Sequence, residues 1–434
     1  MNIEQRAAFV LTTAKVLFVN GQSTEQTVAA AGRLADGLGL HASLLVRWSE
    51  LALLVDGADG AVVRLEGAEP TGVEMDRVAS VMRVIDKLAA GNLNPEEARA
   101  EIETVSHARP APTWLFAIAA AAGAAAMSVI FGVHHFAAAS LIAGSAGIGA
   151  LLRRGVAHLS ENAFLQPLSA ALLAGVVGAL AVRYQLSSSL QLVALCPCMI
   201  LMPGAHLLNG GLDLIRSRIH LGAARILFAL LVVVAIATGL LFGMALLGAK
   251  IPVEPAQAGV PFWLDVIAAG IAVAAYSIFF STPLRMLPWP VAVGALAHAL
   301  RWCVIARIGF GPVGGAFVAC LTVGLILTPV ARSLRIPFAA IAYASVVPMT
   351  PGVYLFRMAS GLTQMSADAG APAALVSATL SDGVVAAAVV LAMCIGLLAP
   401  KLVLDSLIER PTRRTAIDAP SRGAGATTHT IPSA

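Results

Sequence analysis

Three polar side chains interrupt an otherwise apolar stretch, and their types could handle protons or a small charged solute. The stretch LCPCMILMPGAHLLNGGLDLIRSR, residues 195–218, begins like a membrane helix but contains His206, Asn209 and Asp213. Ionisable side chains inside a membrane are costly and usually serve function. His206 could carry a proton near neutral pH. Asp213 lies one helical turn after Asn209 and could bind an ammonium group or a proton, or it could form a plain ion pair with Arg216 at the membrane surface.

A second segment repeats this pattern 148 residues later. ILMPGAHLLN, residues 200–209, aligns with PMTPGVYLFR, residues 348–357, and both contain a Pro-Gly pair within apolar sequence. The matched positions are Pro203 with Pro351, Gly204 with Gly352, Leu207 with Leu355, His206 with Tyr354, and Asn209 with Arg357.

The elements that must position these residues are membrane helices, because each needs about 20 apolar residues and the chain offers ten such segments. The two Pro-Gly segments are the fourth and the ninth, so they are five spans apart. Five is an odd number, and a duplicated five-span unit therefore inserts its second copy upside down. The expected spans are 112–131, 135–152, 163–182, 190–208, 223–248, 262–281, 288–305, 313–330, 338–357 and 373–400.

Helices broken at matching positions of inverted repeats indicate the substrate site of a transporter. Unwound backbone is tolerated at membrane depth only where it is buried in protein or lines a wet cavity. There the freed amides and half-helix ends can hold a carboxylate and an ammonium group. The alternative is a simple proline kink without a ligand. We take residues 111–250 and 260–402 as the two five-span units.

Two further polar residues belong to the candidate site. Arg357 follows the second Pro-Gly pair and could meet a substrate carboxylate, or its side chain could reach the membrane surface instead. Asp382 lies about ten residues into the last span and could carry a proton, unless that helix starts only at Ser381 and leaves Asp382 near the interface. Asp265 lies near a helix start, where the helix dipole stabilises a negative charge. His298 could form a hydrogen bond across helices. Neither residue then needs a role at the candidate site.

Composition divides the chain into a soluble part and a membrane part. Hydrophobic residues make up 58% of the 434 residues and charged residues only 12%, with a mean hydropathy of +0.85. Residues 1–110 carry a net charge of −5 and residues 111–434 a net charge of +9. The basic pI is thus a sum of two unlike parts, and no nucleic-acid role follows from it.

Residues 1–110 read as a small α+β domain. Three β-rich runs near 44–47, 51–55 and 62–66 are separated by Asp-Gly turns, and helices are expected on both sides of them. Ser23 with Gln26 has capping-box spacing, and Asn94 precedes Pro95 as an expected helix cap. The chain start lacks the pattern of a secretory signal, so we expect this domain in the cytoplasm.

Lysine and arginine predict the orientation of the spans. Thirteen fall in the loops after the even-numbered spans and in the tail, against five on the other side. Cytoplasmic loops hold the excess. We therefore expect a multi-pass protein of the bacterial inner membrane with both termini cytoplasmic, and a polar, disordered tail over 403–434.

The sequence gives little support for a catalytic site or a metal site. Residues 1–110 contain neither a nucleophile elbow nor a phosphate-binding loop, so neither an enzyme nor direct ATP drive is expected. Cys196 and Cys198 lack a second pair that would complete a metal site. No cofactor is expected. The alternatives left open are a membrane-tethered enzyme with its site in residues 1–110 and a passive channel.

Three segments carry a family resemblance. GQSTEQTVAAAGRLADGLGL, LMPGAHLLNGGLDLI and MTPGVYLFRMASGL resemble the bacterial threonine/serine exporters. The resemblance covers nearly the whole chain, in the fused form with a soluble domain and two five-span units. It implies efflux of small neutral hydroxy amino acids, driven by the proton-motive force, and leaves a homo-oligomer open. The second Pro-Gly element has Arg357 and Ser360 where the first has its asparagine and aspartate, so the two copies need not bind alike.

Overall fold

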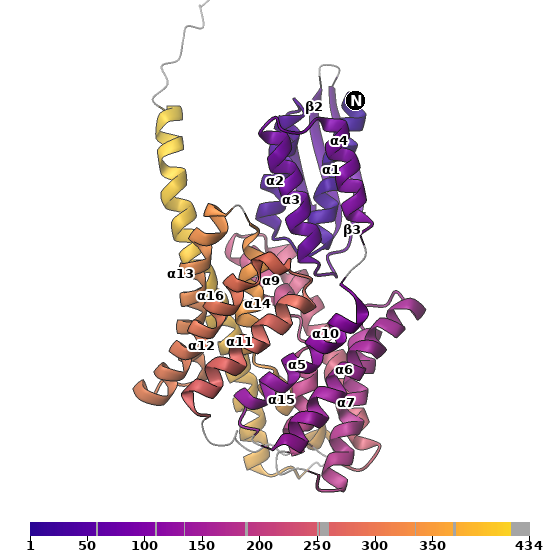
Figure 1. Cartoon of the computed structure of the whole chain (residues 1–434), viewed down its shortest axis with the longest axis vertical. Helices are drawn as coiled ribbons and strands as arrows, with labels where there is room; N and C mark the ends of the chain where they lie inside the picture. The colour runs from indigo at the N-terminus through magenta and orange to yellow at the C-terminus, as the bar shows by residue number, and fades with distance from the viewer. Residues whose placement is uncertain are drawn as a thin grey trace, which may run out of the picture.

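A small α+β domain sits on one end of a large helical body (Figure 1). This computed structural model describes residues 1–417 except 58–59, 109–110, 134, 187–189, 250, 252–259, 335 and 368–369. The fold is mostly helical, as the sequence predicts, and the one sheet among the described residues has three strands.

The N-terminal domain packs four helices with an antiparallel sheet of order β1-β2-β3. Ala42 pairs with Val55, and Val55 pairs with Val62, so the three strands form a meander. Leu51, Leu53 and Val55 are buried on one face of β2. The elements are α1 (Ile3–Val19), α2 (Thr24–Gly37), β1 (Ala42–Arg47), β2 (Ser49–Gly57), β3 (Gly60–Ala68), α3 (Met75–Ala89) and α4 (Pro95–Ser106).

The helix caps confirm one prediction and correct another. Asn94 caps α4 in a capping box with Glu97, and Pro95 lies in the first turn. Ser23 precedes α2 but its side chain makes no capping bond. The predicted capping box with Gln26 is wrong, because the Ser23 amide already donates to Gln22 Oε1 at 2.9 Å.

In the described part of the membrane region, eight helices are long and apolar enough to cross a membrane, and two bent helix pairs raise the number to as many as ten spans if each pair is one span. The pairs α8–α9 and α14–α15 bend by 56° and 51° at the predicted fourth and ninth spans. The helices are α5 (Thr113–Ile130), α6 (Phe136–Leu159), α7 (Leu165–Arg183), α8 (Leu190–Met199), α9 (Gly204–Ile215), α10 (Ile219–Ala245), α11 (Phe262–Phe279), α12 (Pro288–Ile308), α13 (Pro312–Ser333), α14 (Phe338–Val346), α15 (Gly352–Ala367) and α16 (Ala373–Ile417).

The two five-span units have the same internal packing. Helix starts such as Leu190 and Phe338, or Gly204 and Gly352, keep the sequence offset of 148 residues. The pairs α7–α10 and α13–α16 make the most extensive contacts of their units, and α5 packs on α11 between the units. Because five spans separate equivalent helices, the second unit is inverted.

Helix α16 is longer than the expected last span. It continues to Ile417, past residue 402 where the polar tail is predicted to begin. Lys401 on this helix donates to Glu25 of the N-terminal domain at 2.8 Å. We call the side of the bundle that carries the N-terminal domain the domain face, and the opposite side the far face. Residues 418–434 of the expected tail lie outside the described residues.

Candidate functional site

The two helix breaks pack against each other at the contact between the units. A Cβ atom added to Gly204 would lie 2.9 Å from Val347 Cγ2 of the second break. A Cβ atom added to Gly352 would lie 3.3 Å from Met199 Cγ of the first. Each break therefore places its glycine against the other break, and a larger residue at either position would push the units apart.

Local turns satisfy much of the backbone that the breaks release. At the first break, Gly204 donates its amide to the Met202 carbonyl at 2.9 Å. The buried Tyr276 of α11 donates its hydroxyl to the Met199 carbonyl at 2.9 Å. At the second break, Gly352 donates to the Thr350 carbonyl at 2.8 Å. Pro203 and Pro351 immediately precede α9 and α15, where the missing proline N–H does no harm.

Asn209 connects three segments of the chain. Its Nδ2 donates to the carbonyl of Gly21, in the turn between α1 and α2, at 3.1 Å. Its Oδ1 accepts the hydroxyl of Tyr343 on α14. Asn209 is buried, so both groups of its amide are used. This residue couples the N-terminal domain and both membrane units.

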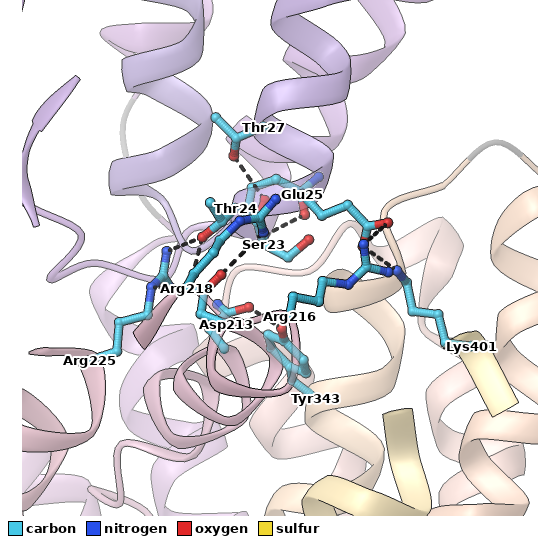
Figure 2. Close-up of polar contacts among 12 residues, drawn as sticks. Ser23, Thr24, Glu25, Thr27, Asp213, Arg216, Arg218, Arg225, Tyr343 and Lys401 are labelled. Carbon is cyan, nitrogen blue, oxygen red and sulfur yellow. Dashed lines mark hydrogen bonds and ion pairs between the residues drawn. The ribbon is translucent and has the colours of Figure 1, made fainter. Parts of the chain in front are cut away.

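Asp213 is buried between the N-terminal domain and α10. Its carboxylate accepts from Thr24 Oγ1 at 2.9 Å and lies 3.2 Å from Nε of Arg225 and 3.4 Å from Nη1 of Arg218 (Figure 2). Arg225 is fully buried and also lies over the Phe18 ring at 5.0 Å. Asp213 therefore lies in an ion-pair cluster inside the protein.

Glu25 bridges the two membrane units on the domain face. Its carboxylate lies 2.6 Å from Nη1 of Arg216, directly after α9, and 2.8 Å from Nζ of Lys401 on α16 (Figure 2). Arg216, considered above as a partner of Asp213, thus reaches an acid of the N-terminal domain. The first turn of α2 therefore contacts both units.

His206 faces an aromatic cluster. Its ring lies 5.0 Å from that of Phe228, edge to face. Phe228 also packs against Trp48 of the N-terminal domain at 5.4 Å and Phe164 at 5.6 Å. His206 is buried, so any proton that it carries would have to reach it through this packed interface.

Arg357 and Asp382 form a second buried ion pair. Arg357 Nε lies 3.0 Å from Asp382 Oδ2, and both residues are buried. The Arg357 side chain is therefore paired inside the protein and does not extend into solvent. Because α16 begins at Ala373, Asp382 lies well inside the helix, and the alternative start at Ser381 is wrong. Tyr354, on the same helix as Arg357, is half-buried.

A third buried pair joins Asp265 and His298. Nδ1 of His298 on α12 lies 3.3 Å from Asp265 Oδ2 on α11. The sequence does not predict that these two residues are partners, because they are 33 positions apart. Nothing in a single sequence shows which helices are neighbours. Among the described residues, no cluster of three or more metal-binding side chains occurs.

A cleft opens between the N-terminal domain and the second unit. Its volume is about 540 Å³, which is large enough for a small amino acid. Charged and polar side chains on its walls include Gln26, Arg33, Asp86, Arg332 and Lys401, and Phe338 at the start of α14 closes one side.

The structure brings the predicted site residues together in two groups. Pro203, Gly204, Pro351 and Gly352 meet at the two breaks, and His206, Asn209 and Asp213 continue from there along α9 to the domain face. Arg357 and Asp382 form a separate group with Tyr354 nearby.

Sequence reasoning missed the partners of these residues. Thr24, Arg225 and Tyr343 all contact the predicted residues. Arg225 could have been noticed in the sequence, because an arginine is unusual within the long apolar segment 219–245. One alignment needs correction: the offset of 148 residues places Gly361, not Ser360, opposite Asp213.

Comparisons with known proteins agree with this architecture. Residues 8–247 match the family described as "Putative threonine/serine exporter", and residues 265–403 match the family described as "Threonine/Serine exporter, ThrE". A Mycobacterium tuberculosis protein named "Probable threonine/serine exporter" is 24% identical over 362 residues, covering 79% of this chain and 67% of its own. No solved structure matches the chain. The N-terminal domain, the two five-span units and these matches together show that the chain belongs to the threonine/serine exporter ThrE family.

Proposed function

We propose that this protein exports threonine and serine from the cytoplasm and that the proton-motive force drives the transport. The observation that carries the proposal is the reciprocal contact of two broken helices from inverted units, Gly204 against Val347 and Gly352 against Met199. Transporters built from inverted repeats bind substrate between such helices and expose the site alternately to the two sides.

The half-helices that begin at the breaks supply the binding chemistry. The N-termini of α9 and α15, at Gly204 and Gly352, face the contact between the units. A helix N-terminus favours the carboxylate of an amino acid. The ammonium group and the transported proton need a carboxylate. Asp213 in the first unit and Asp382 in the second unit can supply one.

The domain face is the cytoplasmic face in this proposal. Arg153, Arg216, Arg285 and Arg332 lie near the helix ends on this face, in agreement with the excess of positive charge expected on the cytoplasmic side. Both chain termini are then cytoplasmic, and the protein lies in the bacterial inner membrane. The cleft of about 540 Å³ opens on the same face and offers a loading route for substrate.

The N-terminal domain serves the transporter and not a separate reaction. Gly21 in the turn before α2, and Thr24 and Glu25 in the first turn of α2, contact the membrane units. These polar groups are therefore engaged in docking, which supports a structural or regulatory role.

Transport in liposomes tests the proposal. Purified protein is reconstituted, and movement of labelled threonine and serine is followed with and without an imposed pH gradient. Gradient-driven uptake that an uncoupler abolishes is the expected result. Movement that ignores the gradient would indicate a passive channel, and absence of movement of both amino acids would contradict the substrate assignment.

A matched pair of variants links the result to the breaks. Gly204→Val forces a side chain into Val347, whereas Gly144→Val adds one on α6 where nothing lies within 4 Å. We expect transport to be lost in the first and kept in the second, at equal abundance in the membrane.

A further inference from the structure

In each five-span unit, a buried ion pair joins the second half of the broken helix to the helix that follows it. In the first unit, Asp213 on the second half of the broken helix pairs with Arg225 on the following helix, α10, at 3.2 Å. In the second unit, Arg357 on the second half of the broken helix pairs with Asp382 on the following helix, α16, at 3.0 Å. The signs are exchanged: the acid lies on the broken helix in one unit and on its neighbour in the other.

The two pairs lie near opposite faces of the membrane. Asp213 contacts Thr24 of the N-terminal domain, so its pair is at the domain face. Asp382 precedes Lys401 by nineteen residues on α16, and Lys401 contacts Glu25 of the same domain. At 1.5 Å per residue this separation is about 28 Å, which is close to the thickness of the hydrocarbon core. The Arg357–Asp382 pair is therefore near the far face.

Groups outside the two paired helices form hydrogen bonds beside each pair. On the domain face, the Gly21 carbonyl accepts from Asn209, and Thr24, the first residue of α2, donates to Asp213. On the far face, the carbonyl of Ile251, between α10 and α11, accepts Ser360 Oγ at 3.1 Å and Gln364 Nε2 at 3.3 Å. Ser360 follows Arg357 by one helical turn.

Arg225 retains unused hydrogen-bonding capacity beside its ion pair. Among the described residues, its Nη1 is buried without a hydrogen-bond partner. The desolvation of a buried ion pair offsets much of its Coulomb attraction, so such a pair can open at modest cost when another charged group takes its place. The carboxylate of an amino acid suits the arginine and its ammonium group suits the aspartate.

We propose that these two ion pairs are the gates of the transport cycle, Asp213–Arg225 on the domain face and Arg357–Asp382 on the far face. Each gate opens when its half-helix moves away from the following helix. The carboxylate of the passing amino acid then pairs with the separated arginine, and its ammonium group pairs with the separated aspartate. In this structure both gates are closed. The proposal rests on the proposed transport function, and its test does not depend on a transported substrate.

Thiol labelling measures the opening of each gate separately. Native Cys394 reports on the domain face, because its Sγ would lie 2.7 Å from a Cβ added to Gly211, on the same helix as Asp213. Ser360→Cys reports on the far face. Each reporter is placed in a protein whose other cysteines are replaced by alanine, and a membrane-impermeant maleimide is applied from one side of oriented vesicles.

Breaking one gate should expose its own reporter alone. Asp382→Asn is expected to raise the labelling rate of Ser360→Cys from the far face about tenfold and to leave Cys394 no more reactive. Arg225→Gln is expected to raise the labelling of Cys394 from the domain face and to leave Ser360→Cys no more reactive. The charge exchange R357D/D382R should restore slow labelling, whereas R357D alone should not.

The outcomes separate the gates from the transport function. Unchanged labelling in Asp382→Asn and Arg225→Gln, with folding verified by gel filtration and thermal melting, would overturn the gates even if threonine is transported. The expected labelling pattern in a protein that moves neither threonine nor serine would keep the gates and contradict the substrate. Equal labelling of both reporters in every variant would also overturn the proposal, because it indicates general loosening.

Discussion

Single side chains hold the N-terminal domain on the bundle, and Asn209 connects that domain with both membrane units. Its amide satisfies the Gly21 carbonyl and the Tyr343 hydroxyl in a buried place. Asn209→Ala should lower the free energy of unfolding by about 2–6 kcal/mol, because two buried polar groups lose their partner at about 1–3 kcal/mol each. Thermal melting in detergent measures this loss.

Tyr343→Phe is the matched control for Asn209→Ala. It removes one hydroxyl and leaves the bond from Asn209 to Gly21 in place, so the loss should be about half as large. A melting temperature of Asn209→Ala equal to that of the unmodified protein would contradict the role of Asn209 as a connection between the segments.

Asp213 should matter for transport more than for folding of the whole chain. Asp213→Asn keeps the size of the side chain and an oxygen that can accept from Thr24, while it removes the charge that faces Arg225. We expect strongly reduced threonine efflux from cells at similar membrane abundance. Asp36→Asn, on the exposed end of α2, is the control. Normal efflux in Asp213→Asn would rule out a role in the transport cycle.

At the scale of elements, glycines allow helices to touch along their backbones. Gly239 and Gly243 on α10 contact the carbonyls of Leu168 and Leu172 on α7. In the second unit, a Cβ atom at Gly324 would lie 2.6 Å from the Leu397 carbonyl across α13 and α16. Small residues allow this close approach, which stabilises membrane helix pairs by van der Waals contact. The equivalent pair of helices is joined in the same way in both units.

Gly239→Ala should therefore destabilise the protein although alanine favours helices. Its Cβ has no space against Leu168, so α7 and α10 must separate. Gly144→Ala, on the open surface of α6, should be neutral or stabilising by up to about 1 kcal/mol through helix propensity. The two melting temperatures in detergent give the comparison, and a Gly239→Ala protein as stable as Gly144→Ala would show that the close approach is unimportant.

The sequence was informative about elements and much less so about their neighbours. The ten spans, the two breaks and the Asn94 cap of α4 follow from local patterns, namely apolar length, Pro-Gly pairs and cap spacing. Partners such as Arg225 for Asp213 and His298 for Asp265 depend on which helices pack together, which no local pattern records. The failed cap at Ser23 has a local cause instead, since the side chain of the adjacent Gln22 accepts the Ser23 amide.

At the scale of the whole molecule, Glu25 ties the N-terminal domain to both units at once. Glu25→Gln removes the charge that holds Arg216 and Lys401. We expect faster hydrogen exchange in the turn between α1 and α2 and at the start of α2, with little change in the sheet. The exchange of β2, measured in the same sample, serves as the internal control. Unchanged exchange throughout would show that the bridge does not hold the domain.

The one-sided position of the N-terminal domain has a thermodynamic consequence. Two inverted copies of one unit would give the inward-open and outward-open conformers nearly equal populations. The contacts of Gly21, Thr24 and Glu25 stabilise closure on one side only, and each 1.4 kcal/mol of such docking changes the population ratio about tenfold. The resting protein should therefore be mostly closed on the domain face, and loosening the domain, not altering the substrate site, is the simplest way to shift that ratio.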